Sequence, residues 1–285
     1  MRCSWLFLIC GLFQLLPVQE GPYLYPWLPA GEVREALAER IPTPAGFTRA
    51  TFAPGSFASW LRRLPLKPAG TPVFLFNKQK KGNQSVHHAV IALDTGPRNL
   101  QQCADAVIRL RAEYLFSRGR LNEIAFHFTS GHLSAFTRWA RGERPVIRGN
   151  RVTWRRTAAA DSSHAALRRY LSNLFIYAGS YSLAQEMTPT SIAAITSGDV
   201  FVQGGFPGHA VLVVDLARHE QSKEKIFLLA QSYMPAQDMH VLKNLNDPKL
   251  SPWYRLPAGA ELATPEWTFR ATDLRAFHSP TQTVR

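Results

Sequence analysis

Hydrophobic and polar positions follow two different periods along this chain, and the change comes near residue 198. Before it, the clearest patterns place apolar residues three and four positions apart, as in helices with one buried face. After it, short β-branched and apolar runs alternate with glycine-rich and charged turns, as in an antiparallel series of strands. We predict helices over residues 31–40, 57–64, 100–116, 133–140 and 162–177, and strands over 200–202, 210–216, 226–230, 239–242 and 267–269.

Weaker patterns complete the expected fold. Strands are predicted at 73–76 and 89–93 around a polar hairpin, a second hairpin turns at Arg-Gly-Asn within 146–154, 124–128 fits a strand or a helix start, and Gly179 suits the C-cap of the helix before it. Helices precede the strands and no internal repeat is present, which favours an α+β fold over repeated βαβ units. We predict one α+β domain over residues 21–285.

The N-terminal segment has the pattern of a targeting sequence. Met1-Arg2 is followed by an apolar run over residues 5–16 and then by Pro17. A basic start and about a dozen apolar residues match a secretory signal and are too few for a comfortable membrane span. No small-x-small cleavage site is evident, so residues 1–20 are predicted to be a signal peptide or an N-terminal anchor. We expect an exported protein of the periplasm, the envelope or the medium, with membrane contact only through an uncleaved N-terminus.

Composition narrows the class of protein. The 285 residues are 46% apolar, which excludes a disordered polar chain. Three cysteines without a Cys-x-x-Cys spacing exclude a disulfide framework and a structural zinc site. The net charge of +13 and the pI near 10.1 indicate a polyanionic neighbour, which could be nucleic acid, an acidic envelope polymer or a membrane surface.

Much of this charge lies in one arginine-rich stretch. Residues 138–169 contain nine Arg against Glu143 and Asp161, a net charge of nine minus two, or +7. Trp139 and Trp154 are interleaved, and Arg beside aromatic rings can bind phosphates, carboxylates or bases. An internally paired basic face, a surface for an envelope polyanion and a nucleic-acid surface all remain open. Since an exported protein meets little nucleic acid, we expect no nucleic-acid partner, and the contacts proposed for an acidic polymer are Arg141, Arg144, Arg148, Arg151, Arg155 and Arg156.

Cys103 is the first candidate for chemistry. Asn99 and Gln102 fit a capping box, which would place Cys103 in the first turn of the following helix. Unpaired N–H groups and the helix dipole lower the pKa of a thiol there, so that a nucleophilic thiolate can form. Cys103 also begins an amphipathic stripe with Val107, Leu110 and Tyr114, so it could equally be a small core residue.

His209 and Gln231 complete a possible catalytic group. His209 opens a predicted strand after a Gly/Pro loop, and Gln231 ends the next strand. Adjacent strands can place an amide beside an imidazole, as the orienting third member of a Cys–His–polar arrangement. A histidine at a strand start can also be a surface group or a satisfied core group, and that alternative stays open.

Three short segments of the chain resemble the CHAP and NlpC-like cell-wall peptidases and amidases. The resemblance rests on Gln102-Cys103 at a helix start, on Gly208-His209-Ala-Val at a strand start and on Gln231-Ser-Tyr233 after the next strand. It implies a papain-like or NlpC-like α+β fold, with helices packed on an antiparallel sheet and a large helical insertion between Cys and His. It also implies hydrolysis of amide bonds in a peptidoglycan-like envelope polymer. The implied roles are nucleophile for Cys103, base for His209, orienting group for Gln231, and oxyanion or supporting groups for Gln102, Asp199 and Tyr233.

A second resemblance spans most of the chain. The segments Leu100–Tyr114, Gly204–Ala210 and Leu229–Gln237 together resemble the bacterial domain-of-unknown-function family 4846. That family fixes no activity. An alternative to the hydrolase is therefore a non-catalytic envelope protein that binds an acidic polymer through its Arg-rich face.

Other chemistries lack a motif. The sequence has no G-x-S-x-G, Walker A, G-x-G-x-x-G or H-E-x-x-H, so we expect no cofactor. His87-His88 and the pair His127 and His132 lack clustered carboxylates, so we expect no metal site. The oligomeric state is not predicted.

Overall fold

The computed structural model describes residues 25–29, 32, 34–255 and 261–278. The predicted signal or anchor over residues 1–20 lies outside these ranges. Within them, no helix is both long enough and apolar enough to cross a membrane.

The described residues form an α+β fold, as predicted. The helices are α1 (Leu37–Arg40), α2 (Phe57–Arg62), α3 (Cys103–Ser117), α4 (Phe136–Ala140), α5 (His164–Leu174) and α6 (Ser180–Glu186), with 3-10 turns at Leu121–Glu123, Ile192–Ala194 and Ala271–Asp273. The strands are β1 (Phe47–Arg49), β2 (His87–Val90), β3 (Ala125–His127), β4 (Leu133–Ala135), β5 (Glu143–Arg148), β6 (Arg151–Arg156), β7 (Thr188–Pro189), β8 (Val200–Gln203), β9 (His209–His219), β10 (Lys225–Gln231), β11 (His240–Leu242), β12 (Glu261–Ala263), β13 (Thr268–Arg270) and β14 (Leu274–Ala276).

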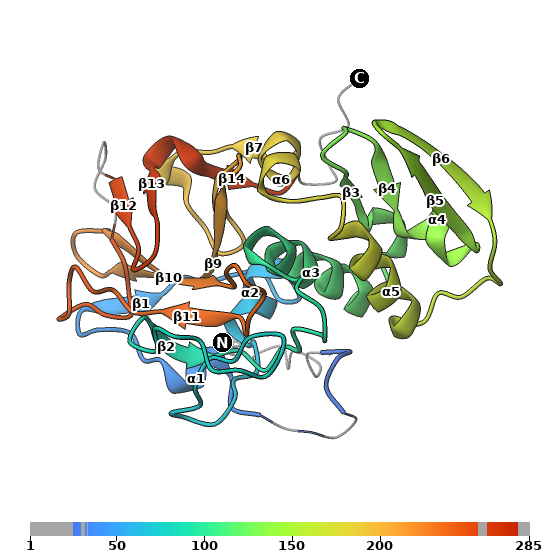
Figure 1. Ribbon diagram of the computed structural model, residues 1–285. Coiled ribbons are helices and arrows are strands. Elements are labelled where there is room, and N and C mark those ends of the chain that lie inside the picture. Colours follow the sequence, from blue (N-terminus) through green and yellow to red (C-terminus); the bar gives the residue numbers. More distant parts are fainter. Residues whose placement is uncertain (1–24, 30–31, 33, 256–260, 279–285) are drawn as a thin grey trace, which may run out of the picture.

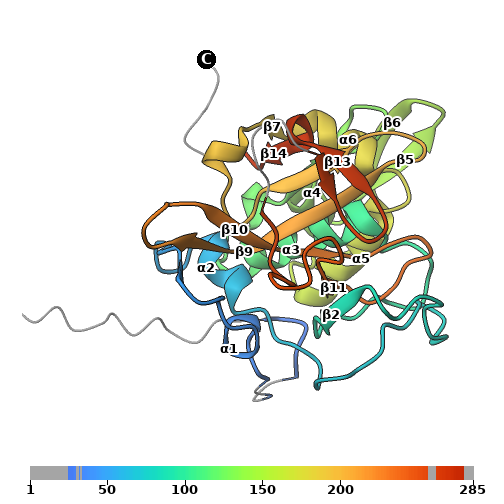
Figure 2. The same cartoon turned by 90° about the vertical axis from the view of Figure 1, so that its left-hand side faces the viewer.

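One antiparallel sheet organises the described part of the chain. Its strand order is β2-β11-β10-β9-β8-β14-β7, and β1 pairs with the far end of β9. The two longest strands, β9 and β10, run side by side through its centre (Figures 1 and 2). The predicted antiparallel series after residue 198 is therefore confirmed.

The two faces of the sheet are both buried, against different layers. Along β9, Ala210, Leu212 and Val214 pack with the helices, whereas Val211 and Val213 pack with the β12–β13 hairpin. This is the period-two alternation of a strand covered on both sides, which is why β9 reads as a continuous apolar run.

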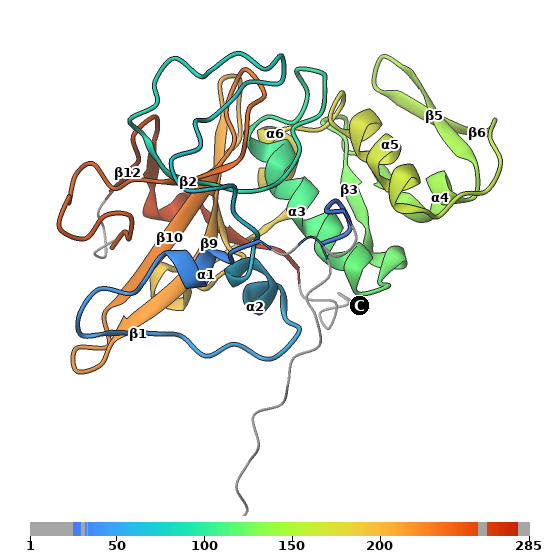
Figure 3. The ribbon, with the colours of Figure 1, turned by 90° about the horizontal axis from the view of Figure 1, so that it is seen from below.

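Helix α3 lies between the sheet and a lobe built from α4, α5 and the hairpins β3–β4 and β5–β6 (Figures 1 and 3). Both faces of the helix are covered, so it is buried nearly all round and not only along the predicted stripe. Its polar interior positions are paired with one another. Arg109 contacts Glu113 at 2.6 Å and Asp94 at 3.0 Å, and Glu113 also contacts His164 of α5 at 2.9 Å. These bonds tie the helix to the lobe.

The predicted hairpin within residues 146–154 is confirmed as β5–β6, but the insertion between the Cys helix and the His strand is less helical than expected. It contains the β3–β4 and β5–β6 hairpins as well as α4, α5 and α6. Residues 133–135, predicted as helix, pair with β3 as strand β4. The predicted strand at 73–76 is wrong in another way: Phe74 and Leu75 make isolated bridges only.

Two predicted helix ends are also wrong. Helix α3 begins at Cys103 and not at residue 100, because Asn99 uses its side-chain oxygen to accept a hydrogen bond from the N–H of Ala236 at 2.7 Å. Gly179 does not cap the end of the preceding helix but is the N-cap of α6, a short helix without a sequence signal of its own.

Candidate active site

The first turn of α3 carries the candidate nucleophile. Gln102 is the N-cap and Cys103 is the first helical residue. Cys103 therefore lies about one turn nearer the N-terminus of the helix than predicted. The capping bond runs from the N–H of Gln102 to the carboxyl group of Asp105, at 3.1 Å. This arrangement places the thiol where the first N–H groups of the helix have no partner within the helix.

The Cys103 thiol is buried, and its pKa differs from the predicted direction. Burial raises the pKa to about 11, and the Asp105 carboxyl group raises it as well. The N–H groups of Cys103, Ala104 and Ala210 act in the opposite direction but do not outweigh burial. The expectation of a lowered thiol pKa was therefore wrong, because a helix N-terminus in the interior loses more solvation than its N–H groups replace.

The sheet supplies one of these N–H groups because two strands part at this point. The β9–β10 ladder ends at the pair Leu212 and Ala230, so no partner on β10 faces the N–H of Ala210. That group reaches the sulfur of Cys103 instead. Since Ala210 directly follows His209, the fold brings the candidate nucleophile to the residue beside the candidate base.

His209 is positioned by a tightly packed loop. At Gly208, a Cβ atom would lie 2.6 Å from the carbonyl oxygen of Gln203 and would also meet the Ser180 hydroxyl. Glycine permits this close approach because it has no side chain. The loop can therefore fold back along β8 only because this position has no side chain.

The ring of His209 is hydrogen-bonded to Gln231. His209 Nε2 lies 2.8 Å from Gln231 Oε1, and the two residues are 1% and 0% exposed. Burial lowers the pKa of His209 to about 4, while the bond to Gln231 acts in the opposite direction. Cys103 and His209 are therefore a neutral thiol and a neutral imidazole near pH 7, and among the described residues no hydrogen bond joins them.

Aromatic rings enclose the imidazole. The ring centroids of Tyr233, Trp267 and Phe269 lie 4.8, 5.4 and 5.9 Å from that of His209. Burial first, and then the charges of Glu266 and Cys103, raise the pKa of the Tyr233 hydroxyl, which places Tyr233 within electrostatic range of the thiol. Tyr233 therefore belongs to the site.

A cleft of about 400 Å³ opens beside Cys103. Among the described residues, the ionisable groups that line it are Cys103 and Asp105, both with raised pKa values. Phe206 and Met234 lie at the cleft and are 86% and 63% exposed, so the opening has an apolar rim. The remaining lining residues are Asn99, Leu100, Gln102, Ala104, Phe175, Ala178, Gly179, Ser180, Gly205, Pro207 and Gly208.

Of the other predicted supporting residues, Gln102 lies at the site and Asp199 does not. Gln102 lines the cleft, with its side-chain amide donating to Asn99 at 3.2 Å. Asp199 is not brought to the site: it pairs with Val213, four residues beyond His209 along β9. Its carboxyl group accepts from the N–H of Thr196 at 2.8 Å, and burial raises its pKa to about 6.

Two further polar residues at the site, Glu266 and Lys81, had no signal in the sequence. Gln231 donates from Nε2 to Glu266 at 2.7 Å, and Glu266 forms an ion pair with Lys81. Glu266 directly precedes the predicted strand at 267–269 and Lys81 lies in the predicted polar hairpin, so each resembled an ordinary solvated charge. Only the tertiary fold brings them to Gln231.

The central part of the Arg-rich stretch forms the β5–β6 hairpin at the outer edge of the lobe (Figure 1). Cross-strand register places Arg144 opposite Arg155 and Arg148 opposite Arg151. Arg144 lies over the ring of Trp139 at 3.8 Å and is partly buried, so it is less available than predicted. The exposed members of the predicted set are Arg141, Arg148, Arg151, Arg155 and Arg156.

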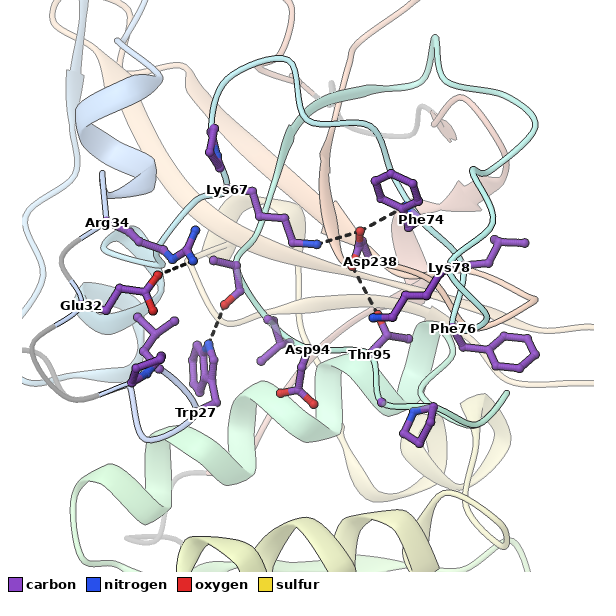
Figure 4. Close-up of a pocket in the computed structure, with 18 of the residues that line it drawn as sticks. Trp27, Glu32, Arg34, Lys67, Phe74, Phe76, Lys78, Asp94, Thr95 and Asp238 are labelled. Atoms are coloured by element: carbon purple, nitrogen blue, oxygen red, sulfur yellow. Dashed lines mark hydrogen bonds and ion pairs between the residues drawn. The ribbon is translucent and has the colours of Figure 1, made fainter.

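A larger cavity, of about 840 Å³, lies between Trp27 on one side and Phe74 and Phe76 on the other (Figure 4). Most of its charged groups are paired: Asp238 with Lys67 at 2.9 Å, Glu32 with Arg34, and Asp94 with Arg109 and Arg168. It contains no cysteine or histidine, so we place the candidate chemistry at Cys103. Within the described ranges, no group of three or more His, Cys, Asp or Glu side chains could hold a metal ion.

Fold and site together define an α+β protein with a buried Cys–His–Gln cluster beside a cleft. The chain belongs to the family described as "Domain of unknown function (4846)", whose model matches residues 37–276, so the predicted resemblance to that family is confirmed. No curated protein and no solved structure matches the chain.

Proposed function

We propose that this protein is an exported cysteine amidase or peptidase, with a papain-like or NlpC-like arrangement, that hydrolyses amide bonds in a peptidoglycan-like envelope polymer. The observation that carries the proposal is the Cys103 thiol at the first residue of α3, against the N–H that follows His209. Nucleophile and base on separate elements, with the base oriented by a third polar group, is the arrangement that acyl transfer requires.

The proposed reaction runs through a thioester. His209 takes the proton from Cys103 as the sulfur attacks the amide carbon. The C–N bond then breaks, His209 passes the proton to the leaving amine, and the acyl group stays on sulfur. Water, deprotonated by His209, attacks the thioester and releases the carboxylic acid and the thiol. The N–H of Cys103 and the amide of Gln102 are the proposed donors to the oxyanion.

Because Cys103 and His209 are both neutral in the free protein, we expect the thiol proton to move to His209 as the sulfur attacks, and not before the substrate binds. With pKa values of about 11 for the thiol and about 4 for the imidazole, the ion pair is the minor form in the free protein. Negative charge appears on the substrate oxygen as the proton moves, and preorganised N–H groups stabilise it there.

The lining of the cleft supports an uncharged substrate at the bond that breaks. Leu100, Phe175 and Met234 are apolar, and Phe206 and Pro207 extend the apolar surface. A peptide bond between small neutral residues suits this surface. A charged group beside the bond would lose hydration without gaining a partner.

The test is hydrolysis of purified peptidoglycan by the full chain, followed through newly released amino groups. We expect release by the wild type and a loss of at least about 1,000-fold in Cys103→Ser and His209→Gln, since each removes a member of the reacting pair. Arg98→Ala, an exposed change near the N-terminus of α3, is the control. Equal release by the wild type and Cys103→Ser would contradict the proposal.

The β5–β6 hairpin favours a second candidate function, the binding of an acidic polymer without catalysis. Arg148 and Arg151 are opposed across the strands and both exposed, so their repulsion is relieved when a polyanion binds between them. Expected retention on poly-L-glutamate falls as salt rises. It is lost in the fourfold Ser variant of Arg148, Arg151, Arg155 and Arg156 but kept in a fourfold Ser variant of the exposed Arg98, Arg118, Arg218 and Arg270. Retention that survives both high salt and the hairpin variant would contradict this function.

A further inference from the structure

Gln231 is held at both ends of its side-chain amide. Its Oε1 faces His209 Nε2 at 2.8 Å, and its Nε2 donates to Glu266 Oε2 at 2.7 Å. An amide has a donor end and an acceptor end, and the partner that can only accept decides which end faces it. Glu266 in its ion pair with Lys81 is such a partner.

Glu266 itself is fixed in place. It lies in the turn between β12 and β13, where Thr264 Oγ1 accepts from the N–H of Trp267 at 3.1 Å and donates to its carbonyl oxygen at 2.7 Å. Trp267 Nε1 donates to Gln203 at 3.1 Å, which anchors the turn to strand β8, beside His209. The backbone that carries Glu266 is therefore fixed beside β8, and the contacts with Lys81 and Gln231 hold its carboxyl group.

Lys81 supplies the counter-charge. The side chains of Lys81 and Glu266 are 8% and 14% exposed, so the ion pair lies mostly inside the protein. The Lys81 backbone is held in turn, because Gln84 Nε2 donates to its carbonyl oxygen at 2.7 Å. Lys81, Glu266, Gln231 and His209 form one continuous chain of polar contacts.

We propose that Glu266, held by Lys81, is a positioning residue that fixes the tautomer of His209 through Gln231. With Oε1 of Gln231 facing it, Nε2 of His209 carries the proton, and Nδ1 keeps the lone pair that accepts the proton of Cys103. Glu266 also provides, one amide away, a negative charge that stabilises the imidazolium formed during the reaction. This inference rests on the proposed hydrolase function.

Nitrogen NMR of the ¹⁵N-histidine-labelled full chain tests the tautomer directly, with His209 assigned from His209→Gln. We expect the wild type to show Nε2 protonated and Nδ1 bare. Glu266→Gln can donate as well as accept, so the amide of Gln231 loses its preferred orientation and the ring becomes a mixture of tautomers. Glu261→Gln, an exposed change on β12, is the matched control and should leave the ring as in the wild type.

Exchanging the amide of Gln231 and the carboxyl group of Glu266 tests whether the tautomer of His209 can be restored. In the double variant Gln231→Glu, Glu266→Gln, the acceptor again faces His209, and we expect the Nε2-protonated tautomer to return. Where peptidoglycan is hydrolysed, Glu266→Gln should lower kcat by about 100-fold with KM little changed, since the base is misplaced while the cleft is intact. An unchanged tautomer in Glu266→Gln overturns the inference.

The outcomes separate the two proposals. A mixed tautomer in Glu266→Gln, in a protein that cleaves no amide, supports the positioning and ends the hydrolase proposal. Hydrolysis by the wild type with an unchanged ring in Glu266→Gln does the reverse. If Glu266→Gln fails to fold, Lys81→Met tests the same link, and a ring that stays wholly Nε2-protonated overturns the inference.

Discussion

His209 Nε2 and Gln231 Oε1 lie 2.8 Å apart on neighbouring strands, in a part of the molecule closed to solvent. The contact holds a neutral imidazole that is only 1% exposed. Protonation of that ring therefore destabilises the folded protein, and this property leads to the first two predictions.

Acid should destabilise the protein through His209. Its pKa is about 4 in the folded protein, against 6.5 for an ordinary histidine, so the unfolded chain binds more protons between these values. Stability is thus full above pH 6.5 and falls as the pH falls towards 4, by about 2 kcal/mol for this group between pH 7.5 and 5. Urea unfolding of the wild type and His209→Gln at both pH values measures this difference. An equal loss in both proteins would contradict it.

The pH dependence of hydrolysis should show a broad plateau. The active form has a neutral His209 and a protonated Cys103, so kcat/KM should fall on the acid side near the His209 pKa of about 4. On the alkaline side it should fall only towards the Cys103 pKa of about 11. The measurement is kcat/KM from pH 4.5 to 10. An alkaline limb near about pH 8.5 would instead indicate a resting thiolate–imidazolium pair.

Replacement of Gly208 should disturb the site and the fold together. In Gly208→Ala the new Cβ meets the carbonyl oxygen of Gln203 at 2.6 Å and the nitrogen of Gly205 at 2.8 Å. Relief requires a backbone shift beside His209, with an expected loss of about 1–3 kcal/mol in the free energy of unfolding. Gly82→Ala, where nothing lies within 4 Å, is the control. Thermal unfolding of both variants checks this, and equal Tm values would contradict it.

Removal of Arg109 should weaken the tie between α3 and the lobe. Arg109 is 0% exposed and contacts Glu113, Asp94 and Gln101. Arg109→Ala leaves the buried Glu113 with only His164, so we expect a loss of about 3–5 kcal/mol. Urea unfolding against Arg98→Ala, an exposed change, provides the measurement. A loss below that range would show that the buried pair contributes little.

The site residues that could be predicted are those with a local pattern. Cys103 follows two polar residues at a helix start, and His209 follows a loop of small residues, so both stand out in the sequence. The helix start itself was misplaced by one turn, since Asn99 and Gln102 are both acceptable caps and only the contact of Asn99 with Ala236 decides between them. Local pattern cannot include a partner 137 residues away.

Other features depend on burial and on pairing over long distances. The sequence predicted a lowered pKa for Cys103 from its helix end, but how deeply that end is buried follows from the lobe. Glu266 reaches Gln231 across 35 residues, and no pattern marks it. Strands as short as β7, with two residues, are too brief to show a period.

The segment from the end of α5 to the start of α6 forms one wall of the cleft, through Phe175, Ala178, Gly179 and Ser180. The opposite side, with Cys103 and the loop before His209, comes from the first turn of α3 and the central sheet. In the proposed hydrolase, selectivity for one polymer over another can therefore change through this wall while the reacting groups stay as they are.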